Sequence, residues 1–477
     1  FFFCWKLEVF LPQKGTMSCC QQPRPLVVIV GCGAAGLGAA KTLKDNCDLI
    51  ILEGRDRIGG RTHTIECGNK HIPIDLGASW VEGNGRNKHG KINPMTLQAK
   101  KLWRSKPDSG LGSNGGSRRS SFYEDGSGQE KRIMKRYQAI ENEIRNVTKK
   151  ATEDMSLEDA RILAMEKLGY SIDDEEERCG IMESLLSGTE AYFGGGRAQM
   201  SAFWYEAGEE NCYKGRDMWV QNGYGTLVSS FATEDIMSQV RLNHVVTRIT
   251  YQDESNKVNV FARYNNTTTN DGGSEHEISI QCDAIVVALP IGVLQSKSVE
   301  FIPPLPEQKQ DAICGLGSGL MNKVIMVFEK RFWGNLGGWI YGSRTRGKFR
   351  LWIAPEKNEP VLVCLLPPDY AKLSEDLTDE ELQSEAISVL RTCFPSYSNS
   401  IRVTHFYRSQ WWNDPFSRGT WTYIPAGSHP SMIDKIAEPI NDRIFFAGEC
   451  TNRSDFSTVH GAFDSGKRAG EEILALL

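Results

Sequence analysis

Glycines at a characteristic spacing follow a short apolar run near the start of the chain. Gly31, Gly33 and Gly36 come directly after the run LVVIV, and an acid, Glu53, follows about twenty residues later. In such a segment the first glycine permits a tight turn, the second lets backbone approach a pyrophosphate, and the third lets a helix pack on a strand. The N–H groups at the helix start bind phosphate, and the acid binds ribose hydroxyls. The segment, Ala35 included, therefore predicts a dinucleotide site.

A second glycine pair lies directly after the acid, in the run GRDRIGGR at 54–61. Gly59 and Gly60 allow another close approach of backbone to the ligand. Arg55 and Arg61 flank the pair, and arginine suits phosphate because its guanidinium donates two parallel hydrogen bonds. We therefore expect Arg55 and Arg61 to contact the same dinucleotide.

A strand, a helix and a second strand must position these residues. Residues 26–30 and 48–52 are β-branched apolar runs typical of buried parallel strands, and the alanine-rich stretch 37–44 between them predicts a helix. Strands and helices mix along the whole chain, which predicts an α/β fold class with an α+β second domain. Helices are also expected at 130–150, 157–168 and 459–476, and strands at 240–251, 258–264, 284–289, 323–328, 361–366, 401–407 and 443–447.

Two segments are expected to be irregular. The Gly/Ser-rich stretch 105–129 predicts a mobile surface loop, and 265–274 predicts the tip of a hairpin. Neither stretch accounts for the total of 46 glycines. The glycine excess therefore points mainly to backbone that passes close to a ligand.

The overall composition excludes several classes of protein. The chain has 477 residues and a net charge of −5, so no basic surface for nucleic acid is indicated. Mean hydropathy is −0.38, and no apolar run reaches about 18 residues, so no membrane span is expected. The 13 cysteines include no Cys-x-x-Cys pair, so no metal site is expected either.

The chain resembles the flavin-dependent amine oxidases. The resemblance rests on RIGGR at 57–61, DLGASW at 75–80, FAGE at 446–449 and VHGAFDSG at 459–466. It implies FAD as the cofactor, and the binding is expected to be non-covalent because RGTW at 418–421 stands where monoamine oxidases carry their flavin cysteine. The further FAD contacts that it implies are Gly77, Ala78, Ser79, Trp80, Val246, Trp411, Gly448, Glu449, Thr458 and Val459.

Within this family the chain is most similar to the polyamine oxidases. The runs WVEG at 80–83, KINP at 91–94, DMS at 154–156 and WWND at 411–414 carry the similarity in order. It implies oxidation of spermine, spermidine or an acetylated derivative by hydride transfer to flavin N5. Oxygen would be reduced to H2O2, and water would hydrolyse the resulting imine to an aminoaldehyde and a shorter amine.

The resemblance also assigns roles to individual side chains. Lys323 is similar to the lysine that holds a water against flavin N5, and Glu82 to an acid that receives cationic substrate. Glu206 is expected to be a second acid. Trp421 and Thr458 would line the substrate cavity, since indole faces suit cations and methylene chains alike.

Two departures from the family pattern concern the substrate. Thr458 stands where a second aromatic wall is usual, and the pair Met321-Asn322 replaces the tyrosine before the lysine. We therefore expect an altered substrate preference with unchanged redox chemistry.

The resemblance implies two interleaved domains. The FAD-binding domain is expected to comprise residues 25–85, 216–295 and 409–477, and the substrate-binding domain 86–215 and 296–408. Residues 1–24 are expected to be an N-terminal extension, with Met17 as the true start.

Three alternatives stay open. An amino-acid or other amine oxidase would share the fold, and an amino-acid oxidase needs an arginine for the substrate carboxylate. A histone-lysine demethylase is less expected, because no long helical hairpin interrupts the chain. The third is a flavin-bound binding module without turnover. The cysteines read as reduced thiols, which favours a cytoplasmic location and leaves secreted or peroxisomal ones open.

Overall fold

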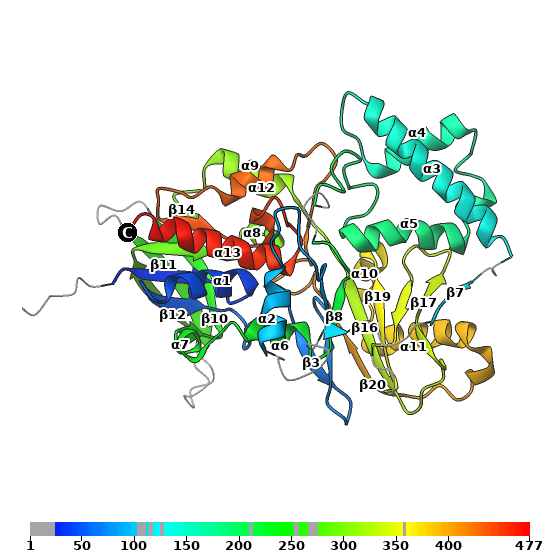
Figure 1. Ribbon diagram of the computed structural model, residues 1–477, viewed down its shortest axis with the longest axis horizontal. Coiled ribbons are helices and arrows are strands. Elements are labelled where there is room, and N and C mark those ends of the chain that lie inside the picture. The colour runs from blue at the N-terminus through cyan, green and yellow to red at the C-terminus, as the bar shows by residue number, and fades with distance from the viewer. Residues whose placement is uncertain are drawn as a thin grey trace, which may run out of the picture.

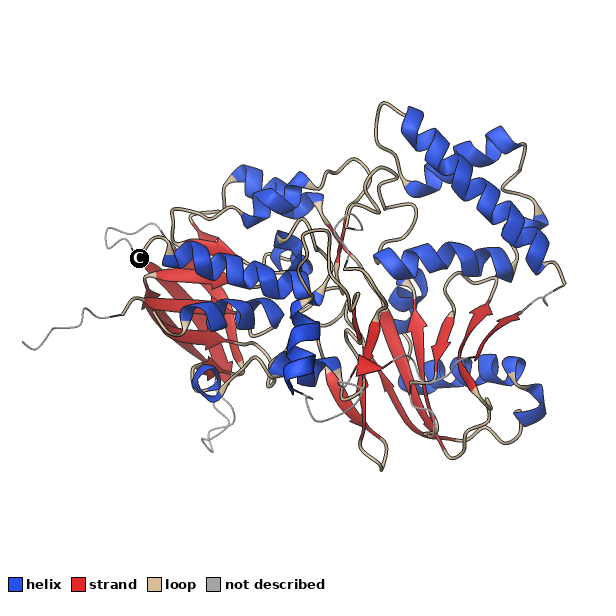
Figure 2. Ribbon diagram, in the orientation of Figure 1, coloured by secondary structure: helices blue, strands red, loops and turns tan. Residues whose placement is uncertain are grey.

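Two bodies of β-sheet and helix lie side by side in the computed structural model (Figures 1 and 2). It describes residues 24–102, 111–112, 118–124, 128–208, 213–251, 257–265, 275–355 and 359–477. Apart from Arg24, the expected N-terminal extension lies outside these residues.

A five-stranded parallel sheet forms the centre of the first body. Its order is β22 (Ile444–Phe446), β13 (Ala284–Val287), β1 (Leu26–Val30), β2 (Asp48–Leu52) and β9 (Val240–Arg241). The strands are apolar because both faces are covered. Helices α1 (Ala34–Leu43) and α13 (Val459–Leu474) pack together on one face. The predicted βαβ unit and α/β class are confirmed.

A second sheet covers the opposite face. Its order is β12 (Glu275–Cys282), β11 (Val258–Asn265), β10 (His244–Thr250) and β14 (Glu300–Ile302). The prediction of one strand over 240–251 is wrong, because the chain turns at Asn243, where φ is +58°, and enters another sheet. The hairpin predicted around 265–274 joins β11 to β12, and its tip lies outside the described residues.

The second body contains a six-stranded sheet. Its order is β20 (Val403–Arg408), β16 (Asn322–Phe328), β19 (Val361–Leu366), β18 (Leu351–Ile353), β17 (Leu336–Gly342) and β7 (Arg118–Tyr123). Helices α10 (Pro368–Glu375) and α11 (Asp379–Cys393) pack on this sheet. β7 lies inside the stretch predicted to be a loop, so that prediction is wrong for 118–123, where pairing with β17 orders the chain. The stretches 105–110, 113–117 and 125–127 lie outside the described residues.

Three long helices complete this body (Figure 1). They are α3 (Glu130–Lys150), α4 (Leu157–Leu168) and α5 (Gly180–Phe193), and α5 contacts β17. The two helices predicted here have the predicted bounds. The buried Arg197 joins two of them, because it pairs with Glu141 of α3 and with Glu158 of α4.

Short elements complete the first body and link it to the second. They are the hairpin β3 (Thr64–Cys67) and β4 (Ile72–Asp75), strands β5 (Trp80–Val81), β6 (Leu111–Gly112), β8 (Met218–Val220), β15 (Gly317–Ser318) and β21 (Thr422–Tyr423), and helices α2 (Pro94–Leu102), α6 (Tyr224–Ser229), α7 (Glu234–Met237), α8 (Ile291–Gln295), α9 (Glu307–Gly315) and α12 (Ser431–Ala437).

The border between the bodies differs from the expected one at one place. β14 pairs with β10, and α9 packs on α12, although both belong to the segment 296–408 expected in the substrate-binding domain. We therefore propose that this border lies between α9 and β16, with the other segments divided as expected. No helix in the described part of the chain is long and apolar enough to cross a membrane.

Candidate active site

The turn between β1 and α1 has the shape that its glycines predict. Gly31 has φ +98°, and a Cβ there would lie 2.8 Å from Ala288 O. A Cβ on Gly36 would lie 1.9 Å from Gly31 O, so only glycine lets helix and strand approach this closely. At Gly33, by contrast, the nearest atom to an added Cβ is 3.9 Å away. Protein packing does not require a glycine at Gly33, which leaves close approach of a ligand as the reason.

Two groups beside this turn suit the two halves of an adenine nucleotide. Gly33 caps α1 without a side-chain hydrogen bond, so the N–H groups of the first helical turn are open to phosphate. The buried carboxylate of Glu53 accepts hydrogen bonds from Cys32 N at 2.8 Å and Arg55 N at 3.0 Å. Burial raises its pKa, and these hydrogen bonds oppose the shift. The Arg55 side chain pairs with Asp414 at 2.8 Å.

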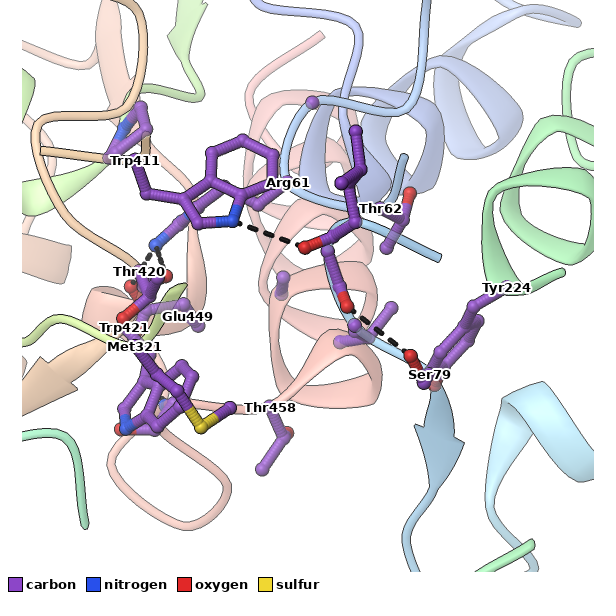
Figure 3. A pocket seen from close by; sticks show the side chains of 18 of the residues that line it. Arg61, Thr62, Ser79, Tyr224, Met321, Trp411, Thr420, Trp421, Glu449 and Thr458 are labelled. Atoms are coloured by element: carbon purple, nitrogen blue, oxygen red, sulfur yellow. Dashed lines mark hydrogen bonds and ion pairs between the residues drawn. The ribbon is translucent and has the colours of Figure 1, made fainter. Parts of the chain in front are cut away.

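Arg61 ties the second glycine loop to the far end of the sequence. Its Nη1 donates to Thr420 O at 2.6 Å and to Glu449 Oε1 at 3.0 Å (Figure 3). Glu449 is 3% exposed and also accepts a hydrogen bond from Ser457 N. Because the buried carboxylate is paired with Arg61 and hydrogen-bonded, segments 388 positions apart are held beside one another.

The N-terminus of a second helix, α13, lies close to the same groups. Thr458 caps α13 by accepting a hydrogen bond from Gly461 N at 2.9 Å. Gly448, with φ +141°, donates its N–H to Ser465 Oγ on the same helix. The positive end of a helix of 16 residues favours negative charge at Val459.

Lys323 lies where the two bodies meet and is 2% exposed on β16. Its Nζ donates to Asp75 O at 3.0 Å, and to Gly77 O and Ser79 Oγ at 2.5 Å each. The Trp80 ring lies 5.6 Å from Nζ. Burial lowers the pKa of Lys323, and the Asp75 carboxylate opposes this effect. The lysine thus fastens the segment 75–80 to the sheet.

Sequence reasoning missed Asp75, which supports the site from behind without lining the cavity. It is fully buried, and its Oδ1 accepts hydrogen bonds from Thr64 Oγ1 at 2.5 Å and Tyr224 N at 2.9 Å. Burial raises the pKa of Asp75, and Lys323 opposes the shift. Asp75 is the first residue of the run DLGASW, and this position in the sequence could have indicated its role.

A cavity of about 1950 Å³ joins these groups. All of the predicted site residues line it except Gly36, which packs helix on strand, and Glu206. Trp411, whose Nε1 donates to Leu76 O at 3.3 Å, and Trp421, Met321 and Thr458 lie along its wall (Figure 3).

The two predicted acids differ in placement. Glu82 lines the cavity, whereas Glu206 is exposed and its neighbour Tyr205 lines the cavity instead. The role given to Glu206 stays a prediction without support from its position. Sequence reasoning also missed a second arm of the cavity, lined by Tyr192 and Phe193 of α5 and by Arg350.

The donors and the space together fit a flavin dinucleotide. Two helix N-termini, a buried acid for ribose and a paired arginine lie along one cavity. Its volume exceeds the roughly 300–1000 Å³ of a site for one small ligand, which leaves room for a second molecule. In the described part of its wall there is no cysteine, so none is in place for a thioether bond to flavin. Fold and site define a dinucleotide-binding protein.

The chain belongs to the flavin containing amine oxidoreductase family, whose pattern matches residues 34–474. Its cofactor is accordingly FAD. Polyamine oxidase 2 of Arabidopsis thaliana is 29% identical over 461 residues, which are 94% of this chain and 88% of that protein. Lysine-specific histone demethylase 1 homolog 1 of Arabidopsis thaliana is 30% identical over 484 residues, but the match covers 52% of that protein.

Solved structures share the fold. Wild-type putrescine oxidase bound to putrescine matches with a TM-score of 0.68 at 19% identity, over 95% of this chain and 99% of that one. A single mutant of putrescine oxidase matches with a TM-score of 0.69 at 19% identity, over 95% of this chain and 100% of that one.

Proposed function

We propose that the chain is a polyamine oxidase that oxidises an extended aliphatic amine with oxygen and releases H2O2. The observation that carries the proposal is the continuity of the cavity, which runs from Glu53 past Lys323 into an arm whose wall is mainly apolar and aromatic and includes Arg350. Relatives named as polyamine oxidases match along most of their length. Non-covalent FAD and a cytoplasmic location are part of the proposal; the nine described cysteines are all free thiols.

The chain's own residues would bind and orient both molecules. Bound FAD supplies a hydride acceptor and its reoxidation by oxygen. Glu53 would hold the ribose, and the N-termini of α1 and α13 would receive the pyrophosphate and the flavin ring. Lys323 would act at the reacting centre, where its Nζ already fixes Gly77 and Ser79.

The substrate must lose a proton from its reacting nitrogen, while its other ammonium groups stay charged. Glu82 would receive one of these cations, and Trp421 would cover the methylene chain. We therefore expect the rate to rise with pH toward the pKa of the reacting amine.

The direct test measures H2O2 release by the purified yellow holoenzyme with spermine, spermidine, acetylated polyamines and L-amino acids. Release with a polyamine is the expected result. Glu82→Gln should raise KM for the polycation with little change in kcat. Glu206→Gln is compared with it, because that acid lies off the cavity wall, and an unchanged KM there would count against its predicted role. Absence of H2O2 with every amine would reject the oxidase in favour of a flavin-bound binding module.

A further inference from the structure

A row of side chains crosses the six-stranded sheet along the second arm of the cavity. The strand register aligns five residues, one from each strand except β20, in the order Lys323, Leu365, Leu351, Ile340 and Ser121. All five line the cavity. Because neighbouring strands lie about 4.8 Å apart, the row extends roughly 19 Å from the lysine. The arm is therefore an apolar track with a hydroxyl at its far end.

Arg350 stands beside this track, directly before β18. Its Nε donates to Ser184 O of α5 at 2.8 Å. A Cβ on Gly188 would lie 2.6 Å from Nη2 of Arg350, so a glycine at this turn of α5 makes room for the guanidinium. Both Arg350 and Gly188 line the cavity. Two strand spacings, roughly 10 Å, separate Lys323 from the strand that Arg350 precedes.

No carboxylate in the described part of the chain forms an ion pair with Arg350. The nearby Glu190 pairs instead with Arg346, which Glu183 also holds. Burial lowers the pKa of the Arg350 guanidinium, which reflects the cost of this enclosed charge. Tyr137 and the Glu190 carboxylate oppose this shift without a direct ion pair, so the arginine adds to the cavity wall a positive charge that no carboxylate of the described residues contacts as an ion pair.

Acidic and basic side chains line different parts of the cavity wall. In the described residues the lining carboxylates lie after β2, in the segments beside β5 and β8, and in the segment before α13: Glu53, Glu82, Asp217, Glu449 and Asp455. None of them comes from the six-stranded sheet or from α5. The second arm instead has Arg331 and Arg350 with the hydroxyls of Ser120 and Ser121. A terminal ammonium would be repelled there, and an anion would be attracted.

We propose that the second arm binds a carboxylate at the far end of the amine substrate, with Arg350 as its binding residue. The inference rests on the proposed function, because it supposes that the reacting nitrogen lies near Lys323. It specifies the substrate class as a polyamine-type amine with an acidic terminus. Methylene groups would lie over Leu365 and Leu351, and the carboxylate would accept hydrogen bonds from the guanidinium.

The test uses two compounds that differ at one terminus. Spermidine has an aminopropyl arm, and N-(4-aminobutyl)-β-alanine has a carboxylate in place of the aminomethyl end of that arm. Values of kcat/KM are measured for wild-type holoenzyme, Arg350→Gln and Arg350→Lys. Arg346→Gln is the matched control, since it removes a neighbouring arginine that does not line the cavity.

Wild type should prefer the carboxylate compound, and Arg350→Gln should lower its kcat/KM about 10- to 100-fold, mainly through KM. Arg350→Lys should restore part of the loss, and spermidine should react no more slowly with the glutamine variant. An unchanged ratio of the two substrates in Arg350→Gln would overturn the inference.

Anaerobic titration of the flavin absorbance with both compounds separates the two proposals. If neither these two compounds nor the amines of the direct test yield H2O2, the proposed function fails, and carboxylate binding that Arg350→Gln abolishes still supports the arm's role. If the carboxylate compound binds wild type and Arg350→Gln alike, the role of Arg350 fails whatever the activity.

Discussion

Lys323 is a buried side chain that both positions a segment of the site and places a charge there. An ammonium group has three N–H donors, and here three oxygens of the segment 75–80 accept from them. The lysine therefore sets the position of that segment as well as the charge beside it. Burial lowers its pKa, so its proton is held less firmly than that of a surface lysine.

Lys323→Met keeps the length of the side chain and removes the donors. We expect flavin reduction or reoxidation to slow on the order of 100-fold, because a positioned proton-bearing group is lost. Stopped-flow absorbance measures the two half-reactions separately. Wild-type rates in both would exclude a role of Lys323 in the reaction.

Lys309→Met is the matched control. Lys309 is also buried and also donates to three carbonyl groups, those of Lys435, Ile436 and Glu438. It does not line the cavity. This variant should lose stability and keep both flavin rates.

At the scale of elements, the glycines of the β1–turn–α1 unit have two different roles. One leaves space for a ligand, and the other lets the helix pack on the strand. The glycines of the unit look alike in the sequence, but an added Cβ meets a backbone oxygen at Gly36 and open space at Gly33. The backbone of Gly33 has φ −84°, which alanine also adopts. One substitution thus tests the ligand, and the other tests the packing.

Gly33→Ala should fold with near wild-type stability as apoprotein and bind FAD at least about tenfold more weakly, since the methyl group enters the ligand space. Gly36→Ala should instead lower the thermal midpoint of the apoprotein, because it forces a 1.9 Å contact with Gly31 O. Flavin content and thermal unfolding distinguish the two. Equal flavin affinity of Gly33→Ala and wild type would argue against a dinucleotide at this turn.

Helix α5 carries a titratable group inside the second body. Glu190 accepts a hydrogen bond from Arg197 N at 3.1 Å, and its Oε2 is buried without a hydrogen-bond partner. Burial raises its pKa from 4.5 to about 7. The fold therefore keeps a proton that the unfolded chain releases, so the free energy of unfolding falls as pH rises through this window.

Glu190→Gln keeps an acceptor for Arg197 N and does not titrate. The stability of this variant relative to wild type should rise between about pH 5 and about pH 8, by up to roughly 3 kcal/mol. Urea unfolding at both pH values measures the change. Glu183→Gln, which also loses a partner of Arg346, is the control, and a difference independent of pH would contradict the raised pKa.

Sequence reasoning predicted the elements whose pattern is local. The runs at 26–30 and 48–52 are strands with those bounds, because continuous β-branched residues suit a sheet buried on both faces. It failed where a segment becomes a strand only through pairing with a strand distant in the sequence. β7 is an example, because Ser120 and Ser121 do not by themselves favour a strand. The same holds for Arg350, which joins the cavity wall only through the order of strands in the sheet.

At the scale of the whole molecule, the cavity is assembled from both ends of the chain. Gly33 and Val459 both line it, and Arg61 pairs with Glu449 across the sequence. A ligand that contacts all these segments must stabilise them together, because it binds the folded state alone.

Removal of FAD should therefore lower the thermal midpoint, and added FAD should restore it by an amount that grows with the logarithm of its concentration above Kd. At a hundredfold excess over Kd the gain is about 2.7 kcal/mol. Calorimetry of apoprotein and holoenzyme over a series of FAD concentrations measures it. A midpoint independent of added FAD would show that the cofactor does not link the two ends.

The position of β1 between β2 and β13 has a consequence for synthesis on the ribosome. The edge of β1 that faces β13 cannot pair until Asp283 has been synthesised, 257 positions after Leu26. At about 5–20 residues per second, that edge stays open for roughly ten to fifty seconds of translation. The nascent chain therefore needs protection of an apolar strand edge, and it can retain its flavin only after α13 has left the exit tunnel.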